Sequence, residues 1–300
     1  MSFGRRTIIS SHLSLKERLE REQELGAEQL GQFLDAHPGT LVITGAGCST
    51  DSGIGDYRDA KGQWKHSQPV QYADFMGKAQ VRRRYWARSL VGWPQFAAAV
   101  PNPAHRALAE LEQLEYVGHL ITQNVDRLHQ RAGQHQVLDL HGRLDQVHCQ
   151  ACDYQVLRRE LQDWLIAHNP AYSPAAVDAH AVGPAPDGDA RIEAPGDDFN
   201  VPACPLCGGI LKPNVVFYGE SVPKEWVELA QGWLTESPAV LVVGSSLMVF
   251  SSFRFCRAAA AAGKPIAILN QGVTRADPLA GLKVGASCAG VLTATVARLR

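Results

Sequence analysis

Three features of the sequence predict a Rossmann-like α/β fold, a doubly wound parallel sheet with a smaller inserted helical plus zinc-ribbon domain. Five short apolar runs have the length and composition of buried strands, and they cover residues 41–44, 119–122, 137–140, 239–243 and 265–269. Helical patterns lie between several of them, at 101–115 and 252–263. Glycine or small hydrogen-bonding residues follow every run. Strands that alternate with helices favour a doubly wound sheet.

The helical patterns carry their own start and stop signals. Asn102 and Pro103 stand at the start of the first pattern, and Gly263 stands at the end of the second.

The segments that follow the five runs predict one ligand site along a single edge of the sheet. They read GAGCST, QNVD, HGR, GSS and NQG in chain order. Ligands of open parallel sheets bind beyond the carboxyl ends of the strands, so one polar ligand explains all five better than five ordinary turns. A dinucleotide fits this edge, with its pyrophosphate at the backbone of Gly45, Ala46 and Gly47. Its ribose and adenine half would lie against Gly244, Ser245, Ser246, Asn270, Gln271 and Gly272.

The first of these loops is not the usual dinucleotide fingerprint. Thr50 stands where the third glycine of G-x-G-x-x-G belongs, and many polar residues follow it. This departure speaks against a hydride-transferring dehydrogenase.

Two segments interrupt the alternation and predict a second, smaller domain. Residues 61–100 are rich in Trp, Tyr, Arg and Gln and are expected to be helical, while residues 145–212 hold four cysteines around a Pro/Asp/Gly-rich stretch at 173–202 that is expected to be mostly loop. The Rossmann-like domain is therefore assigned to residues 30–60, 101–144 and 213–300. Residues 1–29 are predicted to form an N-terminal helical extension.

Two C-x-x-C pairs predict a structural zinc ion. They are Cys149 with Cys152 and Cys204 with Cys207, in a chain without a recognisable export signal. Four thiolates complete a tetrahedral zinc site and leave no open position for catalysis.

Composition excludes several other functions. The 300 residues carry a net charge of about −1, with 45% hydrophobic and 20% charged residues, so a globular protein that binds no nucleic acid is expected. No apolar run approaches the length of a membrane span, and no membrane partner is expected. The basic N-terminus lacks the apolar core of a secretory signal, which predicts a cytoplasmic location, with the mitochondrial matrix as the alternative.

His141 is the candidate catalytic base, because it follows a predicted strand at the ligand edge and histidine titrates near neutrality. Asn124 and Asp126 follow another strand, where either a ligand contact or a cap of the next helix is expected. Asp56 and Arg58 leave the same choice open between a ligand contact and a salt bridge within a turn.

These motifs together resemble the sirtuin family. The matching segments are GAGCSTDSGIGDYR, TQNVDRLH, LHG, the two C-x-x-C pairs, KPNVVFYGE, VGSSL and NQG, which run in the family's order from about residue 30 to the C-terminus. The segments RRRYWARSLVGWPQF, NPAHRAL, APDGD and AILNQGVTRAD are similar to the class II branch, the type of mitochondrial sirtuin 4. One departure is Gly55, where the family usually has proline, and glycine makes the turn less pre-organised.

The resemblance implies an NAD-dependent protein lysine deacylase that consumes NAD. The carbonyl oxygen of an acylated lysine would attack the ribose as nicotinamide leaves, Asn124 and Asp126 would orient the ribose and the nicotinamide amide, and His141 would take a proton from a ribose hydroxyl. The products would be free lysine, nicotinamide and 2′-O-acyl-ADP-ribose. Mono-ADP-ribosyl transfer to protein at the same site is the alternative.

The resemblance also implies the binding residues. Besides the residues named above, NAD contacts are expected from Ser49, Thr50, Ile54, Asp56, Tyr57, Arg58, Gln123, Val125 and Cys288. An acyl-lysine peptide would add as a strand to the segment of Val216, Phe217 and Gly219.

Tyr85 and Arg88 are the residues expected to determine which acyl group is preferred. Their i, i+3 spacing resembles the pair that binds the acyl carboxylate in sirtuins acting on succinyl-, malonyl- and glutaryl-lysine, and arginine suits such a carboxylate. A preference for acyl groups larger than acetyl, including lipoyl and methylglutaryl types, is therefore expected. The alternative is that Arg88 faces solvent or a neighbouring helix.

Overall fold

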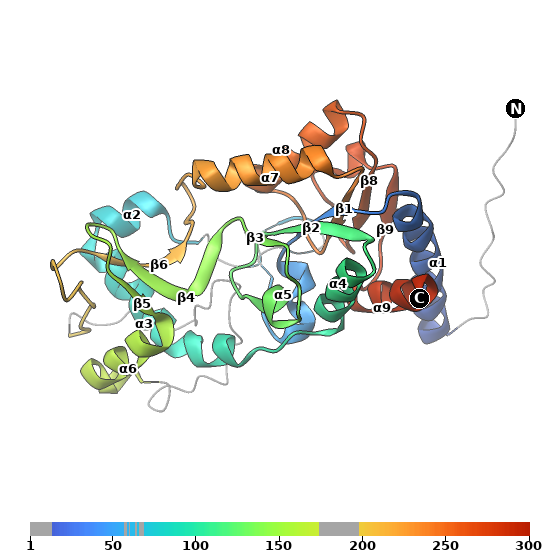
Figure 1. Cartoon of the computed structure of the whole chain (residues 1–300). Coiled ribbons are helices and arrows are strands. Elements are labelled where there is room, and N and C mark those ends of the chain that lie inside the picture. Colours follow the sequence, from blue (N-terminus) through green and yellow to red (C-terminus); the bar gives the residue numbers. More distant parts are fainter. Residues whose placement is uncertain (1–13, 57–58, 60, 64, 66–68, 174–197) are drawn as a thin grey trace, which may run out of the picture.

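The computed structural model describes residues 14–56, 59, 61–63, 65, 69–173 and 198–300. Its larger part is a six-stranded parallel sheet covered by helices, and its smaller part is a three-stranded sheet with helices of its own (Figure 1). All five predicted strands are present, as β1 (Thr40–Thr44), β2 (Val117–Thr122), β3 (Val137–Asp139), β7 (Val240–Val243) and β8 (Ile266–Leu269). The sixth strand, β9 (Leu282–Val284), was not predicted. The predicted fold class is confirmed.

The strand order places a ligand site between β1 and β7. The order is β3-β2-β1-β7-β8-β9, and every pair is parallel. The chain proceeds outward from β1 to β3 on one side and from β7 to β9 on the other, so the order reverses between β1 and β7. Such a reversal leaves a crevice at the carboxyl ends of the two central strands.

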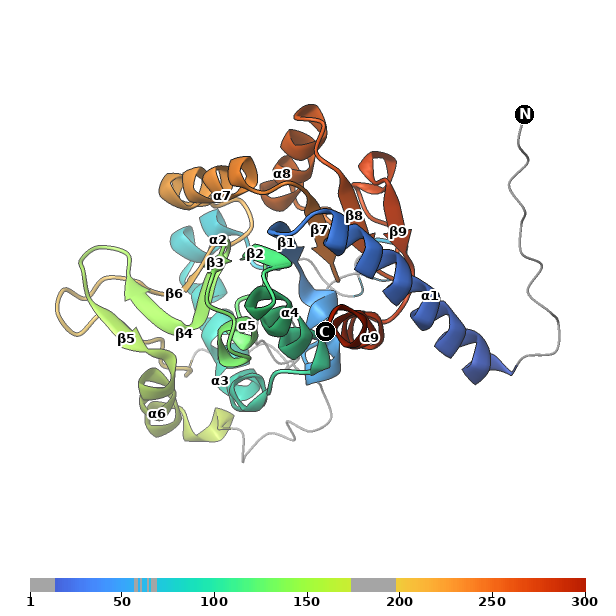
Figure 2. The ribbon, with the colours of Figure 1, turned by 45° about the vertical axis from the view of Figure 1, so that its right-hand side comes forward.

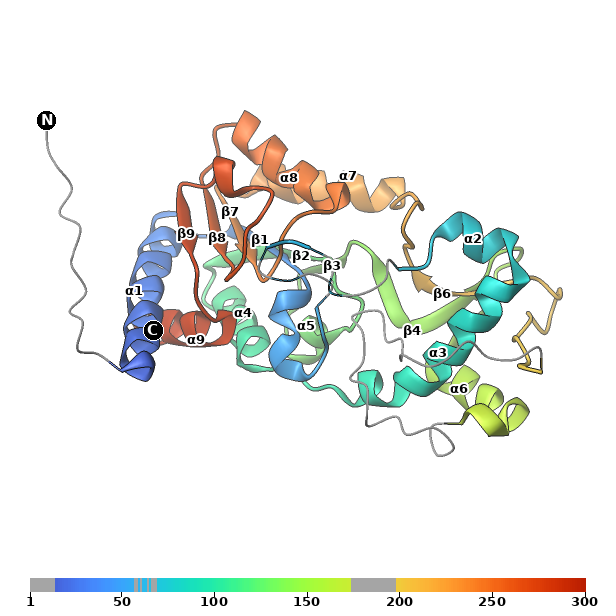
Figure 3. The ribbon, with the colours of Figure 1, turned by 180° about the vertical axis from the view of Figure 1, so that it is seen from behind.

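Helices cover both faces of this sheet (Figure 3). Val42 points to the face packed by α1 (Leu15–Ala36), α4 (Pro103–Gln113) and α9 (Cys288–Leu299). Leu41 and Ile43 point to the opposite face, which is packed by α7 (Lys224–Glu236) and α8 (Phe250–Ala261). Because side chains alternate along a strand and both faces are buried, the strands are continuously apolar, as the sequence indicated.

The two predicted helices are present with shifted ends. Asn102 caps α4 by accepting from the backbone N–H of Ala104 at 2.8 Å, with Pro103 as the first helical residue. Gly263 follows the end of α8 with φ of +69°. The same helix begins at Phe250, two residues before the predicted start, which places Ser251 in its first turn.

Helix α1 packs against α9, and the two helices lie next to each other in Figure 2. A capping box between Ser14 and Glu17 starts it, and its buried face includes Leu30 and Leu34. The boundary predicted between residues 29 and 30 falls inside this helix, so the second half of α1 is part of the large core.

The small domain combines an antiparallel sheet with three helices. Its strand order is β5 (Gln155–Leu157), β4 (Gly142–Cys149) and β6 (Leu211–Val215). Helices α2 (Tyr72–Gly77), α3 (Ala79–Ala98) and α6 (Arg158–His168) pack on it around Phe75, Trp86 and Leu165. The boundaries predicted near residues 144 and 213 fall inside β4 and β6. Most of the loop predicted at 173–202 lies outside the described residues.

The remaining elements are short. They are α5 (Leu128–Arg131) and the 3₁₀ turns η1 (Ala46–Cys48), η2 (Thr50–Ser52), η3 (Pro170–Tyr172) and η5 (Asp277–Leu279). Among the described residues, no helix combines the length and the apolar character that crossing a membrane requires.

Candidate active site

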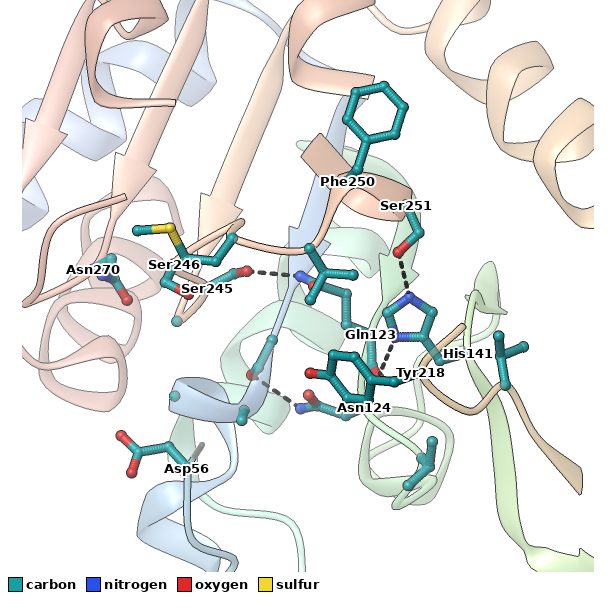
Figure 4. A pocket seen from close by; sticks show the side chains of 18 of the residues that line it. Asp56, Gln123, Asn124, His141, Tyr218, Ser245, Ser246, Phe250, Ser251 and Asn270 are labelled. Atoms are coloured by element: carbon teal, nitrogen blue, oxygen red, sulfur yellow. Dashed lines mark hydrogen bonds between the residues drawn. The ribbon is translucent and has the colours of Figure 1, made fainter. Parts of the chain in front are cut away.

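A cavity of about 1040 Å³ opens where the carboxyl ends of β1 and β7 face the small domain (Figure 4). Most of the predicted site residues line it. These are Gly45, Ala46, Gly47, Thr50, Asp56, Gln123, Asn124, Val125, His141, Val216, Phe217, Gly219, Gly244, Ser245, Ser246, Asn270, Gln271, Gly272 and Cys288. Residues from five strand ends therefore surround one space large enough for a dinucleotide and part of a peptide.

The other predicted site residues that the structure describes do not line this cavity. Ser49 within the first loop and Ile54 after it are buried, and Ser49 Oγ bonds to Asp126. Tyr85 is buried in α3 and Arg88 follows on the same helix. Tyr57 and Arg58 lie outside the described residues.

Two glycines allow the loops of β1 and β7 to touch. The backbone N–H of Gly47 donates to the carbonyl oxygen of Gly244 at 2.8 Å. A Cβ on Gly47 would lie 2.9 Å from that oxygen, and a Cβ on Gly244, whose φ is +59°, would lie 2.3 Å from the nitrogen of Cys48. Only glycine fits either position, and this contact forms the floor beside which a pyrophosphate can approach the backbone.

Gln123 connects the ends of β2, β3 and β7 to α8 through hydrogen bonds. Its side-chain nitrogen donates to Ser245 Oγ at 2.7 Å, and its side-chain oxygen accepts from Ser252 Oγ at 2.9 Å. The side chain is thereby fixed at both ends. Its backbone carbonyl, in turn, accepts from the ring of His141.

A buried network holds Asn124 and Asp126. Asn124 Nδ2 donates to Gly45 O and to Ser49 Oγ, both at 3.0 Å, so its side-chain oxygen is the atom that can accept from a ligand. Ser49 Oγ donates to Asp126 Oδ2 at 2.7 Å, while Asp126 Oδ1 accepts from the backbone N–H of Leu128 at 2.9 Å. Burial raises the pKa of Asp126. Asp126 therefore orients the loop of β1 through Ser49 and also makes the local cap that the sequence left as an alternative.

His141 stands at the junction of the two domains. It lies between the end of β3 and the start of β4, next to Gly142. Gly142 has φ of +80°, and a Cβ there would lie 2.1 Å from the carbonyl oxygen of Asn214, so a side chain at this position would displace the junction.

The hydrogen bonds of His141 define its tautomer. Nδ1 lies 3.2 Å from the carbonyl oxygen of Gln123, and Nε2 lies 2.7 Å from Ser251 Oγ. A carbonyl oxygen can only accept, so Nδ1 carries the hydrogen and Nε2 accepts from the Ser251 hydroxyl. Burial lowers the pKa of His141 to about 4. At neutral pH the ring is therefore a neutral base whose lone pair, on Nε2, faces Ser251 and the cavity.

Sequence reasoning missed Ser251 and its neighbours Phe250 and Arg254, which also line the cavity. The sequence could have indicated them, because they lie at the start of the helix that follows the GSS segment. The predicted helix began two residues too late, at 252, and therefore left out Phe250 and Ser251.

The segment after β6 forms the wall opposite α8. Val216 N–H donates to His141 O at 2.9 Å, Phe217 N–H donates to Glu220 Oε2 at 2.8 Å, and Tyr218 O accepts from Tyr72 N–H at 2.8 Å. Gly219 follows with φ of +80°. This wall is bonded to His141 at Val216 and ends in a turn, in which Glu220 N–H donates to Phe217 O at 3.0 Å.

The four predicted zinc ligands lie together, away from the cavity. Sγ atoms of Cys149 and Cys207 are 3.5 Å apart, those of Cys152 and Cys204 are 3.6 Å apart, and those of Cys152 and Cys207 are 3.5 Å apart. A tetrahedron with Zn–S bonds of ~2.3 Å requires S–S distances of ~3.8 Å, so the cluster has the size of a zinc site. The N–H of Ala151 donates to Cys149 Sγ at 3.3 Å and helps lower the pKa of that thiol to about 7, which favours the metal-binding thiolate.

Comparison with known proteins supports the same assignment. The model of the Sir2 family matches residues 45–251. A protein of Xanthomonas campestris named NAD-dependent protein deacetylase is 56% identical over 264 residues, 88% of this chain and 88% of the relative. The Drosophila melanogaster protein named NAD-dependent protein deacylase Sirt4 is 44% identical over 269 residues, 88% of this chain and 85% of the relative.

Solved structures agree with these relatives. A structure described as "Sir2-p53 peptide-NAD+" is 28% identical, with a TM-score of 0.69 over 91% of this chain and 96% of its own. Another, described as "Structural Basis for the Mechanism and Regulation of Sir2 Enzymes", is 31% identical, with a TM-score of 0.69 over 94% of this chain and 100% of its own. The family match, these relatives and the shared fold establish that this chain belongs to the Sir2 family of NAD-dependent protein deacylases and is similar to its class II branch.

Proposed function

We propose that this enzyme removes acyl groups larger than acetyl from lysine side chains of proteins and transfers them to the ADP-ribose part of NAD. The observation that carries the catalytic part is the neutral Nε2 of His141, which faces a cavity bounded by the loops of β1, β7 and β8 on one side and by Val216–Gly219 on the other. In the overall reaction the bond between nicotinamide and ribose breaks, the acyl group passes from the lysine nitrogen to a ribose hydroxyl, and one water is consumed.

His141 serves as the general base in this proposal. Its Nε2 accepts the proton of a ribose hydroxyl, and that oxygen then attacks the acyl carbon. Gln123 O accepts from Nδ1–H and so selects the tautomer with a bare Nε2, while burial keeps the ring neutral before the step. The Ser251 hydroxyl donates to neutral Nε2, which stabilises the unprotonated ring and orients it.

The strand ends hold the dinucleotide. The backbone at Gly45–Gly47 receives the pyrophosphate, the loops at Ser245 and Asn270 receive the adenosine half, and the side-chain oxygen of Asn124 accepts from the nicotinamide ribose or amide. Enclosure by the small domain excludes water from the scissile bond, so that the acyl oxygen rather than water attacks the ribose.

An extended substrate peptide pairs with the wall of Val216–Gly219. Val216 N–H, Phe217 N–H and Tyr218 O already bond within the protein. The peptide therefore pairs through the peptide groups of Gly219, which sets its register relative to His141.

The function is tested by incubating the protein with NAD and acylated peptides. Deacylated peptide and free nicotinamide should form in equal amounts, with no change at the NADH absorbance. Nicotinamide release with ADP-ribose attached to protein, and no deacylated peptide, would show mono-ADP-ribosyl transfer instead and overturn the proposal.

The acyl preference rests on Tyr85 and Arg88. The ring of Tyr85 packs against that of Phe217, with centroids 5.4 Å apart, and Phe217 lines the cavity. Arg88 lies three residues further along α3, on the same side of the helix. An acyl chain longer than acetyl that passes Phe217 is thereby led toward this pair, where a terminal carboxylate would meet a guanidinium group.

Replacing Arg88 by methionine should reduce kcat/KM for glutaryl and hydroxymethylglutaryl peptides by ~10–100-fold, the scale of a lost hydrogen bond to a charged group. Rates for acetyl and lipoyl versions of the same peptide should change little. Arg84→Met, an exposed position one turn earlier on α3, is the matched control. An equal loss on all four peptides, or acetyl as the best substrate of the parent enzyme, would contradict the preference.

Replacing Ser251 by alanine should lower kcat/KM for deacylation by ~3–10-fold, because neutral Nε2 of His141 loses the hydrogen bond that the Ser251 hydroxyl donates. A bond to the neutral ring lowers its pKa, so the His141 pKa should rise and the acid limb of the pH–rate profile should move to higher pH. Nicotinamide exchange, which needs no base, should be unaffected, and Ser251→Thr should restore both properties. An unshifted pH profile in Ser251→Ala would show that this hydroxyl only fills space.

A further inference from the structure

Three arginine side chains surround one exposed aromatic ring at the mouth of the cavity. Phe250 is 46% exposed. The guanidinium carbons of Arg254, Arg257 and Arg275 lie 5.4, 5.8 and 5.9 Å from the centre of its ring. Two of them come from α8, and Arg275 comes from the connection between β8 and β9. These four residues are called the Phe250 arginine cluster below.

The positive charge of this cluster is not neutralised within the described part of the chain. None of the salt bridges formed by the described residues includes these arginines. Asp277, two positions after Arg275, bonds to Lys283 and Thr274 instead. Arg254 Nε is buried and has no hydrogen-bond partner among the described residues. Three converging cations in a chain whose net charge is about −1 call for an anionic partner.

The cluster adjoins the catalytic group. Ser251, the residue after Phe250, donates to His141 Nε2, and both Phe250 and Arg254 line the same cavity as His141. Figure 4 shows Ser251 pointing toward His141 while Phe250 projects away from it, at the start of α8. When the acyl-lysine of a substrate protein reaches His141, the substrate residues next to that lysine therefore lie close to the cluster.

We propose that the Phe250 arginine cluster binds an aspartate or glutamate that flanks the acyl-lysine in substrate proteins, an inference that rests on the proposed function. A guanidinium group binds a carboxylate through two parallel charge-assisted hydrogen bonds, and the ring of Phe250 packs against the methylene groups of the acidic side chain. Arginines beside an aromatic ring also suit nucleic acid. A peptide is favoured because the cluster opens onto the cavity that receives the acyl-lysine.

The test compares peptides that carry one acyl-lysine and a single aspartate, placed at each flanking position in turn, with peptides that carry asparagine instead. At least one aspartate position should raise kcat/KM and tighten binding by ~5-fold at low salt, and added salt should weaken the effect because the cluster is near solvent. The double variant Arg257→Gln/Arg275→Gln should lose this preference and keep parent activity on the asparagine peptides. Arg159→Gln/Arg298→Gln, exposed on other faces, removes the same charge and should keep the preference.

Three results would overturn the inference. They are equal rates and affinities for all paired peptides in the parent enzyme, an unchanged preference in the cluster variant, and a cluster variant whose only defect is a raised KM for NAD. Competition by an oligonucleotide but not by the aspartate peptide would assign the cluster to nucleic acid and also overturn it. Failure of the proposed function looks different, because no acyl peptide would then release nicotinamide, while fluorescence anisotropy of the labelled peptides would still measure the aspartate preference.

Discussion

Deacylation should fall by at least ~10²-fold when His141 is replaced by alanine, the usual scale for a lost general base. The fold should persist, because His141 lies at a junction and the two hydrogen bonds of its side chain reach only Gln123 and Ser251. NAD should still bind, since the loops of β1, β7 and β8 are untouched. Nicotinamide exchange should also persist, because breaking the bond to ribose does not require the base.

Calorimetry of NAD binding and parallel assays of exchange and deacylation check this result. His135→Ala is the matched control, because that side chain is 77% exposed and lies outside the cavity lining. Near-normal deacylation in His141→Ala, with NAD binding demonstrated, would show that His141 is structural. Loss of exchange and deacylation together would indicate damage to the NAD site rather than loss of a base.

The pH dependence of the rate and of folding stability also reflects the protonation of His141. Burial holds the pKa of His141 at about 4, so the free enzyme keeps its base unprotonated far below pH 6.5. Burial also lowers the pKa of His105 to about 4 and the pKa of His129 well below its usual value. As pH falls below 6.5 the unfolded chain protonates these residues first, so folding stability decreases between pH 6.5 and about 4 and is unaffected by them above 6.5. Rates at low pH must therefore be normalised to the folded fraction measured by circular dichroism.

The sheet could be predicted because its central strands are buried on both faces and are therefore uninterrupted apolar runs. β9 could not, because Leu282–Val284 is a short edge strand that contains Lys283. The order of the strands in the sheet could not be predicted from the sequence either, because strand pairing depends on which helices cover which face.

The candidate site was predictable in so far as function places unusual polar residues directly after strands. Asn124 and His141 belong to this group. Ser251 does not, because its role comes from the distance between two elements more than a hundred residues apart. Asp126 carries the recognisable motif but contacts Ser49 and Leu128 instead of lining the cavity, a distinction that sequence spacing does not contain.

Zinc should be present at about one ion per chain, and its loss should destabilise the small domain before it affects chemistry. Cys149 ends β4, while Cys204 and Cys207 lie on the loop that leads to β6. Cys149 and Cys204 are also buried in the core that joins the three-stranded sheet to α3. Because the four sulfurs converge only in the folded domain, the free energy of metal binding contributes to folding.

Cys204→Ala should therefore yield protein without zinc that is largely insoluble or melts at a much lower temperature. Zinc content by elemental analysis and melting by circular dichroism measure both effects. Activity should be lost as a consequence, because β6 continues into Val216–Gly219, the wall of the cavity that is fixed to His141. Cys256→Ala, at a buried cysteine of α8 outside the cluster, is the matched control and should keep its zinc while losing only modest stability. A Cys204→Ala protein that is metal-free, melts like the parent and remains fully active would refute the zinc assignment, since the small domain would then be stable on its apolar core alone.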